Sequence, residues 1–483
     1  MAKSITQDIL NAFTPSSKAE WEEKASKDLK GKSLGGLTMM KIIQKINQML
    51  KYTILLVFSV TILLSCETDN IQQTENLIVE LNSMLNEVVV LDGHKPPVVS
   101  RIFTYPNIAA YEILRLSDST KYPSLLKGFN SSVKMPVPDQ SVNVEVAALY
   151  TFISLSVELV YRDSILENFL THKMTNYQNF PKNELESSIE FAAKVSDSFV
   201  KLMSNDGYNY TRTLGVYNNN SNLSSWKPTP PKYSYACEPY WSSLVSFCLD
   251  SINQFLPLKH TEFDTAKQSQ FYNNAMEVYT LSKTLSKEQI EIARFWDDNP
   301  SPIQTNGHNI KVKKQLSPPG HWMLIASDIC MQENLNQIQT SLILSTLSVS
   351  MSDAFKSTWH AKYYYDLLRP ITYINRYIDS EWQPLLENPM FPEYTSAHST
   401  ISGAAATVLS HFFDENYALI DSTELPYGHA VRSFSSFNKM ALEVSNSRVY
   451  GGIHYQESCD NGLSMGKKIG DHILTRLHIK NFY

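Results

Sequence analysis

The hydrophobic residues recur at intervals of three and four over most of the chain. In residues 74–91 (TENLIVELNSMLNEVVVL) they fall on one face of a helix, and the same spacing returns in residues 96–115, 143–170 and 184–203. Alternation with a period of two, which is typical of strands, does not dominate any of these segments. The pattern predicts a mainly helical protein.

Three polar segments rich in proline, asparagine or serine interrupt the helical pattern, at residues 204–240, 296–307 and 316–322. The first is long enough to predict a loop that either crosses between two helical layers or lines a site. Glu158 and Arg162 interrupt the longest hydrophobic run of the body, so we expect no membrane-spanning helix there.

Composition and charge exclude several classes of protein. Hydrophobic residues make up 43% of the 483 positions and charged residues 19%, as in ordinary globular proteins. The formal net charge of −6 gives no sign of nucleic-acid binding, so we predict no nucleic-acid partner. None of the five cysteines lies in a C-x-x-C pair, which argues against a zinc ribbon. Cys237 and Cys248 either form a disulfide in an oxidising compartment or are buried thiols.

The N-terminal part reads as an export signal. Within residues 39–66, three lysines precede a hydrophobic run of about 13 residues that is too short to span a bilayer and ends in Leu-Leu-Ser-Cys. This order resembles a bacterial lipobox, with Cys66 lipidated and residues 67–75 as a tether; a short buried core helix is the alternative. Residues 1–38 faintly resemble the N-terminus of the small subunit of methylmalonyl-CoA mutase, and we interpret them as a mis-assigned start or a fusion scar. We therefore expect an exported bacterial lipoprotein, periplasmic or at the cell surface, that meets the membrane only through its lipid anchor.

Candidate chemistry lies in three segments of the last third of the chain. In residues 357–370 (STWHAKYYYDLLRP), Lys362 and Arg369 are seven residues apart, which on one helix places both cations on the same face. Two such cations suit an anion, although Asp366 is an alternative ion-pair partner for Lys362. Pro370 then ends the helix or bends the chain.

The second segment, residues 391–413 (FPEYTSAHSTISGAAATVLSHFF), predicts a helix of small residues with Thr395 or Ser396 as its N-cap. The first turn of such a helix has free N–H groups at its positive end, which suits an oxyanion. His398 lies in that first turn, where it can meet the bound group.

In the third segment, residues 446–455 (NSRVYGGIHY), Gly451 and Gly452 predict that one helix stops and the chain turns. Arg448 would close that helix and His454 would open the next, so that both reach one small anion. Each segment alone is a weak signal, because such residues are usually found on solvated surfaces. The ordered set K-x6-R-P, S-x-H and S-R-x5-H is much more specific.

Together the segments resemble the signature of the vanadium-dependent haloperoxidase and type-2 phosphatidic acid phosphatase superfamily, K-x6-R-P, P-S-G-H and S-R-x5-H. Further stretches resemble landmarks of its soluble bacterial haloperoxidase-like branch: PPVVSRIFTYPNIAAYEIL, WKPTPPKYSYACEPYW, IARFWDDNP and PPGHWM. The resemblance implies an all-α fold built of helical bundles. It places an N-terminal helical region at residues 76–300 and an oxyanion-binding helical bundle, with the active site, at residues 301–483.

The resemblance also implies roles for single residues. The residues implied to bind the oxygens of vanadate or phosphate are Lys362, Arg369, Ser396, Ala397 and Arg448. His454 would ligate vanadium or attack phosphorus, and His398 would be the acid–base group. Lys362 would also polarise the peroxide, and Trp359 and Phe391 would form aromatic walls near the halide path.

The implied reaction is the oxidation of halide by hydrogen peroxide to hypohalous acid, with vanadate as a Lewis acid that keeps its oxidation state. One alternative is an acid phosphatase that cleaves phosphate esters through a phospho-histidine, because phosphate and vanadate share charge and shape. Another is a non-catalytic surface lipoprotein that keeps the helical fold.

Three positions depart from the family pattern. Thr395 replaces a proline, and Ala397 replaces a glycine but keeps its N–H. Ser458 lies four residues after His454, where an aspartate commonly orients the imidazole, so Asp460 is a candidate substitute.

Two other polar groups each have a functional and a structural interpretation. His321 either lines the pocket or packs at a helix start after Pro318 and Pro319. Asp297 and Asp298 form either a metal site or a solvated loop at a helix N-cap. We favour the structural interpretation for both.

Overall fold

The computed structural model describes residues 75–480 apart from residues 219, 301–302, 307–308 and 313, and it describes the backbone alone for residues 303–306 and 309–312. The expectations for residues 1–38, for the signal at residues 39–66 with its lipidated Cys66, and for nearly all of the tether lie outside the described residues. They stay predictions.

The described part of the chain is mainly helical, which confirms the all-α prediction. Side chains start several helices, as when Asn76 accepts hydrogen bonds from the Ile78 and Val79 N–H groups at the start of α4. Between residues 75 and 300 the α-helices are α4 (Leu77–Asp92), α5 (Pro96–Leu114), α6 (Val144–Val157), α7 (Asp163–Met174), α8 (Lys182–Ser204), α9 (Tyr208–Thr211), α10 (Gln270–Thr284) and α11 (Lys287–Phe295).

The helices of the remaining chain are α12 (Pro318–Gln332), α13 (Gln337–Tyr365), α14 (Pro370–Tyr377), α15 (Ala397–Phe413), α16 (Phe437–Tyr450) and α17 (Gln456–Arg476). Two small antiparallel hairpins, which the hydrophobic pattern does not predict, pair β1 (Ile303–Asn306) with β2 (Asn309–Val312) and β3 (Leu419–Asp421) with β4 (Arg432–Phe434). The division that we predict at residue 300 stays a prediction.

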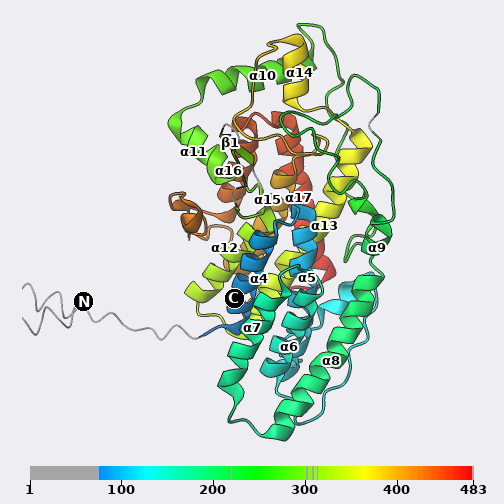
Figure 1. Cartoon of the computed structure of the whole chain (residues 1–483), viewed down its shortest axis with the longest axis vertical. Helices are drawn as coiled ribbons and strands as arrows, with labels where there is room; N and C mark the ends of the chain where they lie inside the picture. Colours follow the sequence, from blue (N-terminus) through cyan, green and yellow to red (C-terminus); the bar gives the residue numbers. More distant parts are fainter. Residues whose placement is uncertain (1–74, 219, 301–302, 307–308, 313, 481–483) are drawn as a thin grey trace, which may run out of the picture. The chain divides into compact units, whose positions relative to one another are not determined.

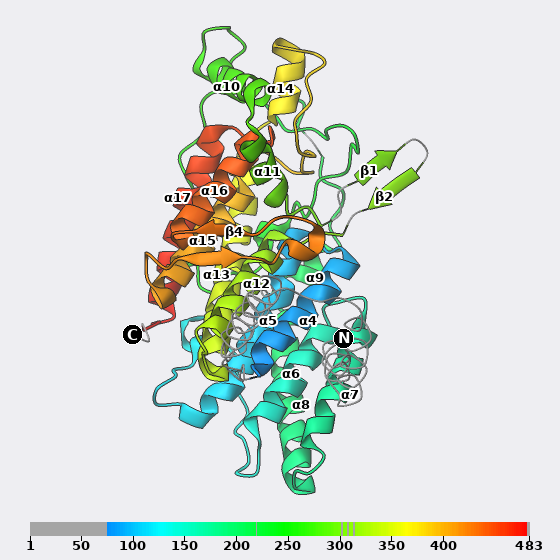
Figure 2. The ribbon, with the colours of Figure 1, turned by 90° about the vertical axis from the view of Figure 1, so that its left-hand side faces the viewer.

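Helix α13 is the central element of residues 75–480. It is buried almost continuously from Thr340 to Trp359, and α4, α5, α12, α15 and α17 all pack against it (Figure 1). Helices α10 and α14 lie at one end of this body and α6 to α8 at the other (Figure 2). One hydrophobic core connects Leu77 in α4 with Leu477 just after α17. The helices near the predicted site therefore rest on a continuous packed interior.

A row of glycines lets α15 and α17 touch backbone to backbone. Gly462, Gly466 and Gly470 follow one another at intervals of four residues on α17. A Cβ atom at Gly466 would lie 1.9 Å from the carbonyl oxygen of Thr400, and one at Gly462 would lie 2.8 Å from that of Ser396. Both distances are shorter than any real contact, so only glycine permits this approach.

The predicted breaks are found, with one correction. Residues 204–240 are largely irregular and contain only the short α9 among their described positions. Pro318 and Pro319, however, form the first turn of α12 instead of the end of a loop. Proline suits that position because the N–H it lacks has no partner in the helix.

His321 in α12 lies between two buried carboxylates. Its Nδ1 is 3.0 Å from Asp298 Oδ1 and its Nε2 is 3.0 Å from Asp421 Oδ2, while its ring stacks on Trp296 with 4.7 Å between the centroids. Burial alone lowers the pKa of His321, but the two carboxylates outweigh it and raise that pKa well above its usual value. His321 thus packs at a helix start, as predicted. The solvated-loop interpretation is wrong for Asp298, which is buried.

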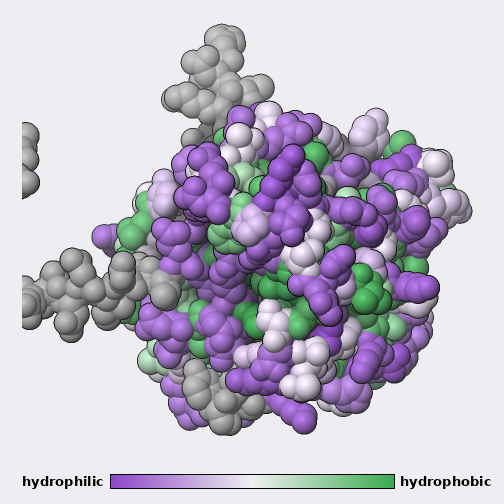
Figure 3. Space-filling model, turned by 90° about the horizontal axis from the view of Figure 1, so that it is seen from below, coloured by the Kyte–Doolittle hydropathy of each residue, from purple (hydrophilic) through white to green (hydrophobic). Residues whose placement is uncertain are grey.

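No helix among the described residues is both long and apolar enough to cross a membrane. The interruption predicted near Glu158 and Arg162 is present, because α6 ends at Val157 and α7 begins at Asp163. The face shown in Figure 3 carries mostly hydrophilic residues, with hydrophobic residues in small groups between them. This distribution agrees with the composition of an ordinary globular surface.

Substitution of Gly466 by alanine should separate α15 from α17. Alanine favours a helix over glycine by about 1 kcal/mol, but its Cβ would overlap the Thr400 carbonyl. We expect the overlap to dominate and the free energy of unfolding in urea to fall by roughly 1–3 kcal/mol. The control is Gly215→Ala, because a Cβ at Gly215 meets nothing within 4 Å. A Gly466→Ala protein as stable as the control would contradict the backbone contact.

Substitution of His321 by glutamine should destabilise the fold, because Asp298 and Asp421 would lose their cationic partner, and breaking a buried ion pair costs ~3–5 kcal/mol. Because the pKa of His321 is raised in the folded protein, this stabilisation is fully present below the ordinary histidine pKa of 6.5. It is lost as the pH rises through the folded-state pKa. The measurement is urea unfolding of the wild type and of His321→Gln from pH 6 upwards. We expect the difference between their free energies of unfolding to shrink as the pH rises. A difference independent of pH would mean that His321 is uncharged. His172→Gln, at an exposed position, is the control.

Candidate active site

Lys362 and Arg369 approach the same region from two different helices. Helix α13 ends at Tyr365, Asp366 adopts the left-handed conformation (φ 50°), and Arg369 is the N-cap residue of α14. The prediction that one helix carries both cations is therefore wrong, although the two are brought together. Pro370 occupies the first position of α14, where proline is favoured.

The Lys362 ammonium group holds a neighbouring stretch of backbone. Its Nζ donates to three carbonyl oxygens of residues 392–395, two of them at 3.0 Å. The Asp366 carboxylate instead accepts a hydrogen bond from Asn220 Nδ2 at 2.7 Å. The alternative in which Asp366 pairs with Lys362 is wrong.

The Arg369 guanidinium connects that backbone to His454. Its Nε and Nη2 both lie 3.1 Å from the Phe391 carbonyl oxygen. Its Nη1 donates to the Ile453 carbonyl at 2.8 Å and lies 3.2 Å from His454 Nε2. A single buried side chain thus contacts both segments that carry the remaining site residues.

Ser396, Ala397 and His398 form the start of α15. Ser396 is the N-cap, as predicted, and its Oγ accepts a hydrogen bond from the Ser399 N–H at 3.3 Å. Ala397 and His398 are the first two residues of the helix, so their N–H groups have no partner within it. Ser396 and Ala397 are both buried.

Arg448 and His454 lie on either side of a turn between two helices. Arg448 lies in the last turn of α16, as predicted, and its Nη1 donates to the Trp296 carbonyl at 2.6 Å. Gly452 adopts a φ of 73°, a conformation that favours glycine. His454 lies two residues before α17 and not inside it, which corrects the expectation that it opens that helix.

Three cations are buried together at this site: Lys362, Arg369 and Arg448 are 0%, 0% and 2% exposed. Burial first, and then the charge of Arg369, lower the pKa of Lys362 well below its usual value, and burial lowers that of Arg369 to about 9. In the described part of the chain, none of the three forms an ion pair with a carboxylate. Burial of like charges is costly, and a bound anion would offset that cost.

The two predicted histidines are neutral in this surrounding. Burial lowers the pKa of both His398 and His454 well below its usual value, and the neighbouring arginine and lysine charges lower it further. A neutral imidazole keeps one nitrogen lone pair. Each histidine can therefore accept a proton or ligate a metal.

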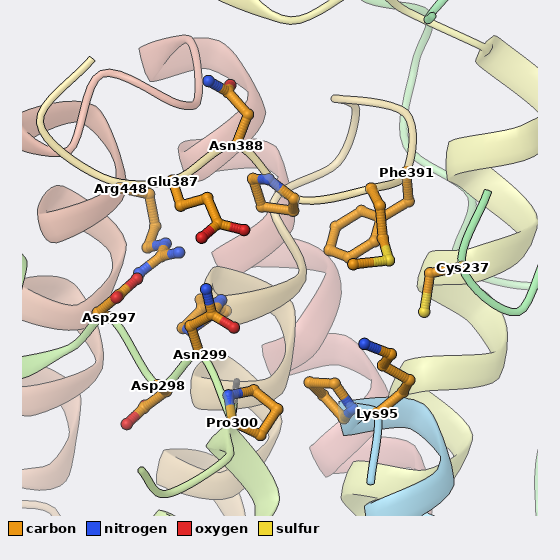
Figure 4. A pocket seen from close by; sticks show the side chains of 14 residues that line it. Lys95, Cys237, Asp297, Asp298, Asn299, Pro300, Glu387, Asn388, Phe391 and Arg448 are labelled. Carbon is orange, nitrogen blue, oxygen red and sulfur yellow. The ribbon is translucent and has the colours of Figure 1, made fainter. Parts of the chain in front are cut away.

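A cavity of about 70 Å³ opens at one side of the site. Of the predicted site residues, Phe391, His398 and Arg448 line it, whereas Lys362, Arg369, Ser396 and His454 are not among its lining residues. Figure 4 shows Arg448 and Asp297 on one wall of the cavity and Phe391 and Cys237 on the opposite wall. The cavity thus reaches the edge of the cation cluster.

The two predicted aromatic walls are in contact. The rings of Trp359 and Phe391 lie 4.9 Å apart, and Trp359 Nε1 donates to the Cys237 carbonyl at 3.1 Å. The Phe391 ring also lies 4.9 Å from Lys362 Nζ and 5.1 Å from Arg369 Cζ. Phe391 therefore separates the cavity from two of the cations and interacts with their charge.

Asp297 contributes to the site in two ways that the sequence did not indicate. Its carboxyl group lines the cavity; burial raises its pKa to about 6, and the nearby charge of Arg448 opposes this rise. Its main chain acts on the ring of His398 and raises the pKa of that histidine, which opposes the lowering by burial. The residue is neither a solvated cap nor part of a metal cluster.

Ligand atoms of Asp298, His321 and Glu424 lie within 4.8 Å of one another, a spacing that could hold a metal ion. Both ring nitrogens of His321, however, already face carboxylate oxygens. A metal ligand must offer a lone pair on a neutral imidazole, and the raised pKa of His321 keeps its ring protonated. We therefore assign this cluster to the fold.

Cys237 and Cys248 are buried free thiols. The disulfide alternative is therefore wrong, and the buried-thiol interpretation is confirmed. Burial raises the pKa of Cys237 to about 12, which keeps this cavity-lining thiol protonated.

The sequence analysis missed the residue that contacts Nδ1 of His454. Glu393 Oε1 lies 2.7 Å from His454 Nδ1, whereas Ser458 Oγ is 3.5 Å away. Asp460 is exposed and accepts a hydrogen bond from Gln456 instead, so its predicted substitution for an orienting aspartate is wrong. The sequence does contain a signal for Glu393, because it is a carboxylate within the FPEYTSAHS stretch and lies three residues before the N-cap Ser396.

Two buried polar atoms at this site indicate what it could hold. Arg448 Nε and His398 Nε2 have no hydrogen-bond partner within the described residues, and both residues line the same cavity. An oxyanion would supply an acceptor for Arg448 and a protonatable oxygen for His398. The residues present therefore fit vanadate or phosphate.

Comparison with known proteins gives the family. A family model described as the VCPO second helical-bundle domain matches residues 342–480, which contain every predicted site residue of the three motifs. The crystal structure of a bacterial vanadium-dependent iodoperoxidase is 36% identical, with a TM-score of 0.77, and the alignment covers 83% of this chain and 96% of that one. A holo-type bacterial vanadium-dependent chloroperoxidase is 15% identical, with a TM-score of 0.60. That alignment covers 81% of this chain and 93% of the chloroperoxidase, and the two proteins share the fold.

A curated relative, the vanadium-dependent bromoperoxidase of Corallina officinalis, is 28% identical over 97 residues. That match covers 18% of this chain and spans only 16% of the bromoperoxidase. The iodoperoxidase match, in contrast, extends over nearly the whole of that protein. This chain therefore belongs to the vanadium-dependent haloperoxidase superfamily and is a haloperoxidase-like enzyme.

Proposed function

We propose that this enzyme uses vanadate to oxidise halide with hydrogen peroxide to hypohalous acid, and that iodide is its preferred halide. The 36% identity to a bacterial iodoperoxidase supports the choice of iodide. The observation that carries the proposal is the cluster of three buried cations. Arg448 Nε, which belongs to this cluster, and His398 Nε2 are both buried and have no hydrogen-bond partner among the described residues.

Several groups would bind the oxyanion. The three cations supply charge, and the first N–H groups of α15 supply oriented donors at the positive end of a helix dipole. The residues to which we assign this binding are Lys362, Arg369, Ser396, Ala397 and Arg448. An anion would compete with the carbonyl oxygens of residues 392–395 for the Lys362 ammonium group.

His454 would be the residue that ligates vanadium. Arg369 can only donate, so the 3.2 Å contact between its Nη1 and His454 Nε2 identifies Nε2 as the nitrogen with the lone pair. Bound vanadate would act as a Lewis acid that activates hydrogen peroxide. The phosphatase alternative would use the same nitrogen as a nucleophile.

His398 would accept and return protons at the anion site. The main chain of Asp297 acts on the ring of His398, and His398 Nε2 is buried without a partner among the described residues. Because its lowered pKa keeps the ring neutral, this nitrogen can accept a proton from peroxide and later return it. Phe391 and Trp359 would keep water away from the path by which halide arrives.

Replacement of His454 by alanine should abolish halide oxidation. The purified protein, stripped of bound anion, would be titrated with orthovanadate while peroxide-dependent oxidation of iodide and bromide is followed. We expect wild-type activity to saturate with vanadate and the variant to stay at background, because the proposed vanadium ligand is lost. His172→Ala, at an exposed position of α7, is the control.

The same preparations would be assayed for hydrolysis of a phosphate ester. Ester hydrolysis that vanadate inhibits, without halide oxidation, would replace the proposal by the acid phosphatase. The absence of both activities in the wild-type protein would favour the non-catalytic lipoprotein.

Replacement of Arg448 by lysine should weaken vanadate binding while leaving the positive charge in place. Lysine lacks the Nε–H, which has no other partner among the described residues. A hydrogen bond to a charged group is worth ~1.5–3 kcal/mol, so the dissociation constant for vanadate should rise roughly tenfold to a hundredfold. Arg476→Lys, a half-exposed arginine paired with Asp250, should bind vanadate like the wild type. Equal affinities in the two variants would contradict a direct contact with Arg448.

A further inference from the structure

Glu393 is a buried carboxylate in contact with His454. It is 0% exposed, and its Oε1 lies 2.7 Å from His454 Nδ1 and accepts a hydrogen bond from the Tyr455 N–H at 3.1 Å. It comes from the connection between α14 and α15, and not from α17, where the family pattern places an orienting aspartate at the position of Ser458. Ser458 Oγ lies 3.5 Å from the same nitrogen.

The hydrogen bonds on the two sides of the ring determine its tautomer. Arg369 Nη1 lies 3.2 Å from Nε2 and has no acceptor capacity, so Nε2 bears the lone pair. The single proton of the neutral ring is then on Nδ1. Glu393 Oε1 must therefore accept the hydrogen bond from Nδ1.

Glu393 is itself fixed by the groups that bind the anion. Its carbonyl oxygen accepts a hydrogen bond from Lys362 Nζ at 3.0 Å, and its N–H donates to the Leu367 carbonyl at 2.9 Å. Arg369 holds the carbonyl of Phe391 two residues earlier. The carboxylate thus has little freedom to leave the imidazole.

We propose that Glu393 is a positioning residue that holds the His454 proton on Nδ1 and aims the Nε2 lone pair at the oxyanion site. It takes the place of the aspartate that Ser458 replaces. The carboxyl acceptor also makes Nε2 a stronger donor to vanadium. The part of this inference that concerns vanadium rests on the proposed function, whereas the tautomer does not.

The test substitutes Glu393 by glutamine. An amide can present either its carbonyl or its NH₂ group to Nδ1, so the ring proton is no longer confined to Nδ1. The first measurement is the ¹⁵N spectrum of the histidine side chains in the anion-free protein, with His454 assigned from the His454→Ala variant. We expect one tautomer with the proton on Nδ1 in the wild type and a mixture of tautomers in Glu393→Gln.

The second measurement is the dissociation constant of orthovanadate, by titration of the full-length protein. Loss of an outer partner of a metal-ligating histidine typically costs about 10–100-fold in affinity, so we expect at least about a tenfold rise. Glu112→Gln is the matched control, because Glu112 is also a buried carboxylate (1% exposed) that accepts from a main-chain N–H, at 2.8 Å from Leu125. That variant should bind vanadate like the wild type.

A rescue separates positioning from a general loss of stability. Adding Ser458→Asp to Glu393→Gln returns a carboxylate to the Nδ1 side from the adjacent turn of α17. Recovery of the Nδ1–H tautomer and of most of the lost vanadate affinity would support the proposal. The proposal would be overturned if Glu393→Gln bound vanadate as tightly as the wild type, or if the wild-type His454 carried its proton on Nε2. It would also be overturned if the double variant bound vanadate as weakly as Glu393→Gln alone.

The failure of the proposed function would look different. A wild-type protein that oxidises no halide, or binds no vanadate, would remove the proposed reaction, while the ¹⁵N spectra of the anion-free proteins would still decide whether Glu393 fixes the tautomer.

Discussion

The burial of three cations around one histidine is the constraint on which the rest of this structure depends. Lys362, Arg369 and Arg448 are shielded from water, so their charge must be compensated inside the protein. Main-chain carbonyl oxygens, especially those of residues 391–395, accept hydrogen bonds from the cationic side chains. Such dipoles stabilise the cations without neutralising them. A bound anion would balance the charge that remains, whereas an ion pair with a carboxylate would remove the need for one.

The helices must be held closely for this arrangement to exist. Ser396 to His398 lie at the start of α15, and His454 lies just before α17, so the two helix starts have to meet. The glycine row on α17 permits that meeting, because a side chain at Gly462 or Gly466 would push the backbone of α15 away. The small residues of α15 and α17 are thus a condition for the site as well as for the core.

The sequence predicts the helices and the motif residues, but only part of their geometry. Periodicity suffices for α8 because it packs one face on the core, whereas α5 is buried at almost every position. The rule that residues seven apart share a helix face fails for Lys362 and Arg369, since Asp366 turns left-handed between them. Asp297 and Asp298 look solvated in the sequence, yet their burial is decided by α12 and α16, which are distant in the chain. Glu393 was missed for the same reason, because its partner His454 lies 61 residues away.

The departures from the family pattern are compatible with a working site when they are considered together. Ala397 retains its N–H, and as the first residue of α15 it needs no positive φ that would demand glycine. Ser458 lacks a charge, but Glu393 brings a carboxylate closer to His454 Nδ1 than the serine oxygen is. In this protein the carboxylate comes from residues 391–395 and not from α17. The segment that orients the imidazole is also the segment held by Lys362 and Arg369, so the aim of the histidine and the position of the cations depend on one stretch of backbone.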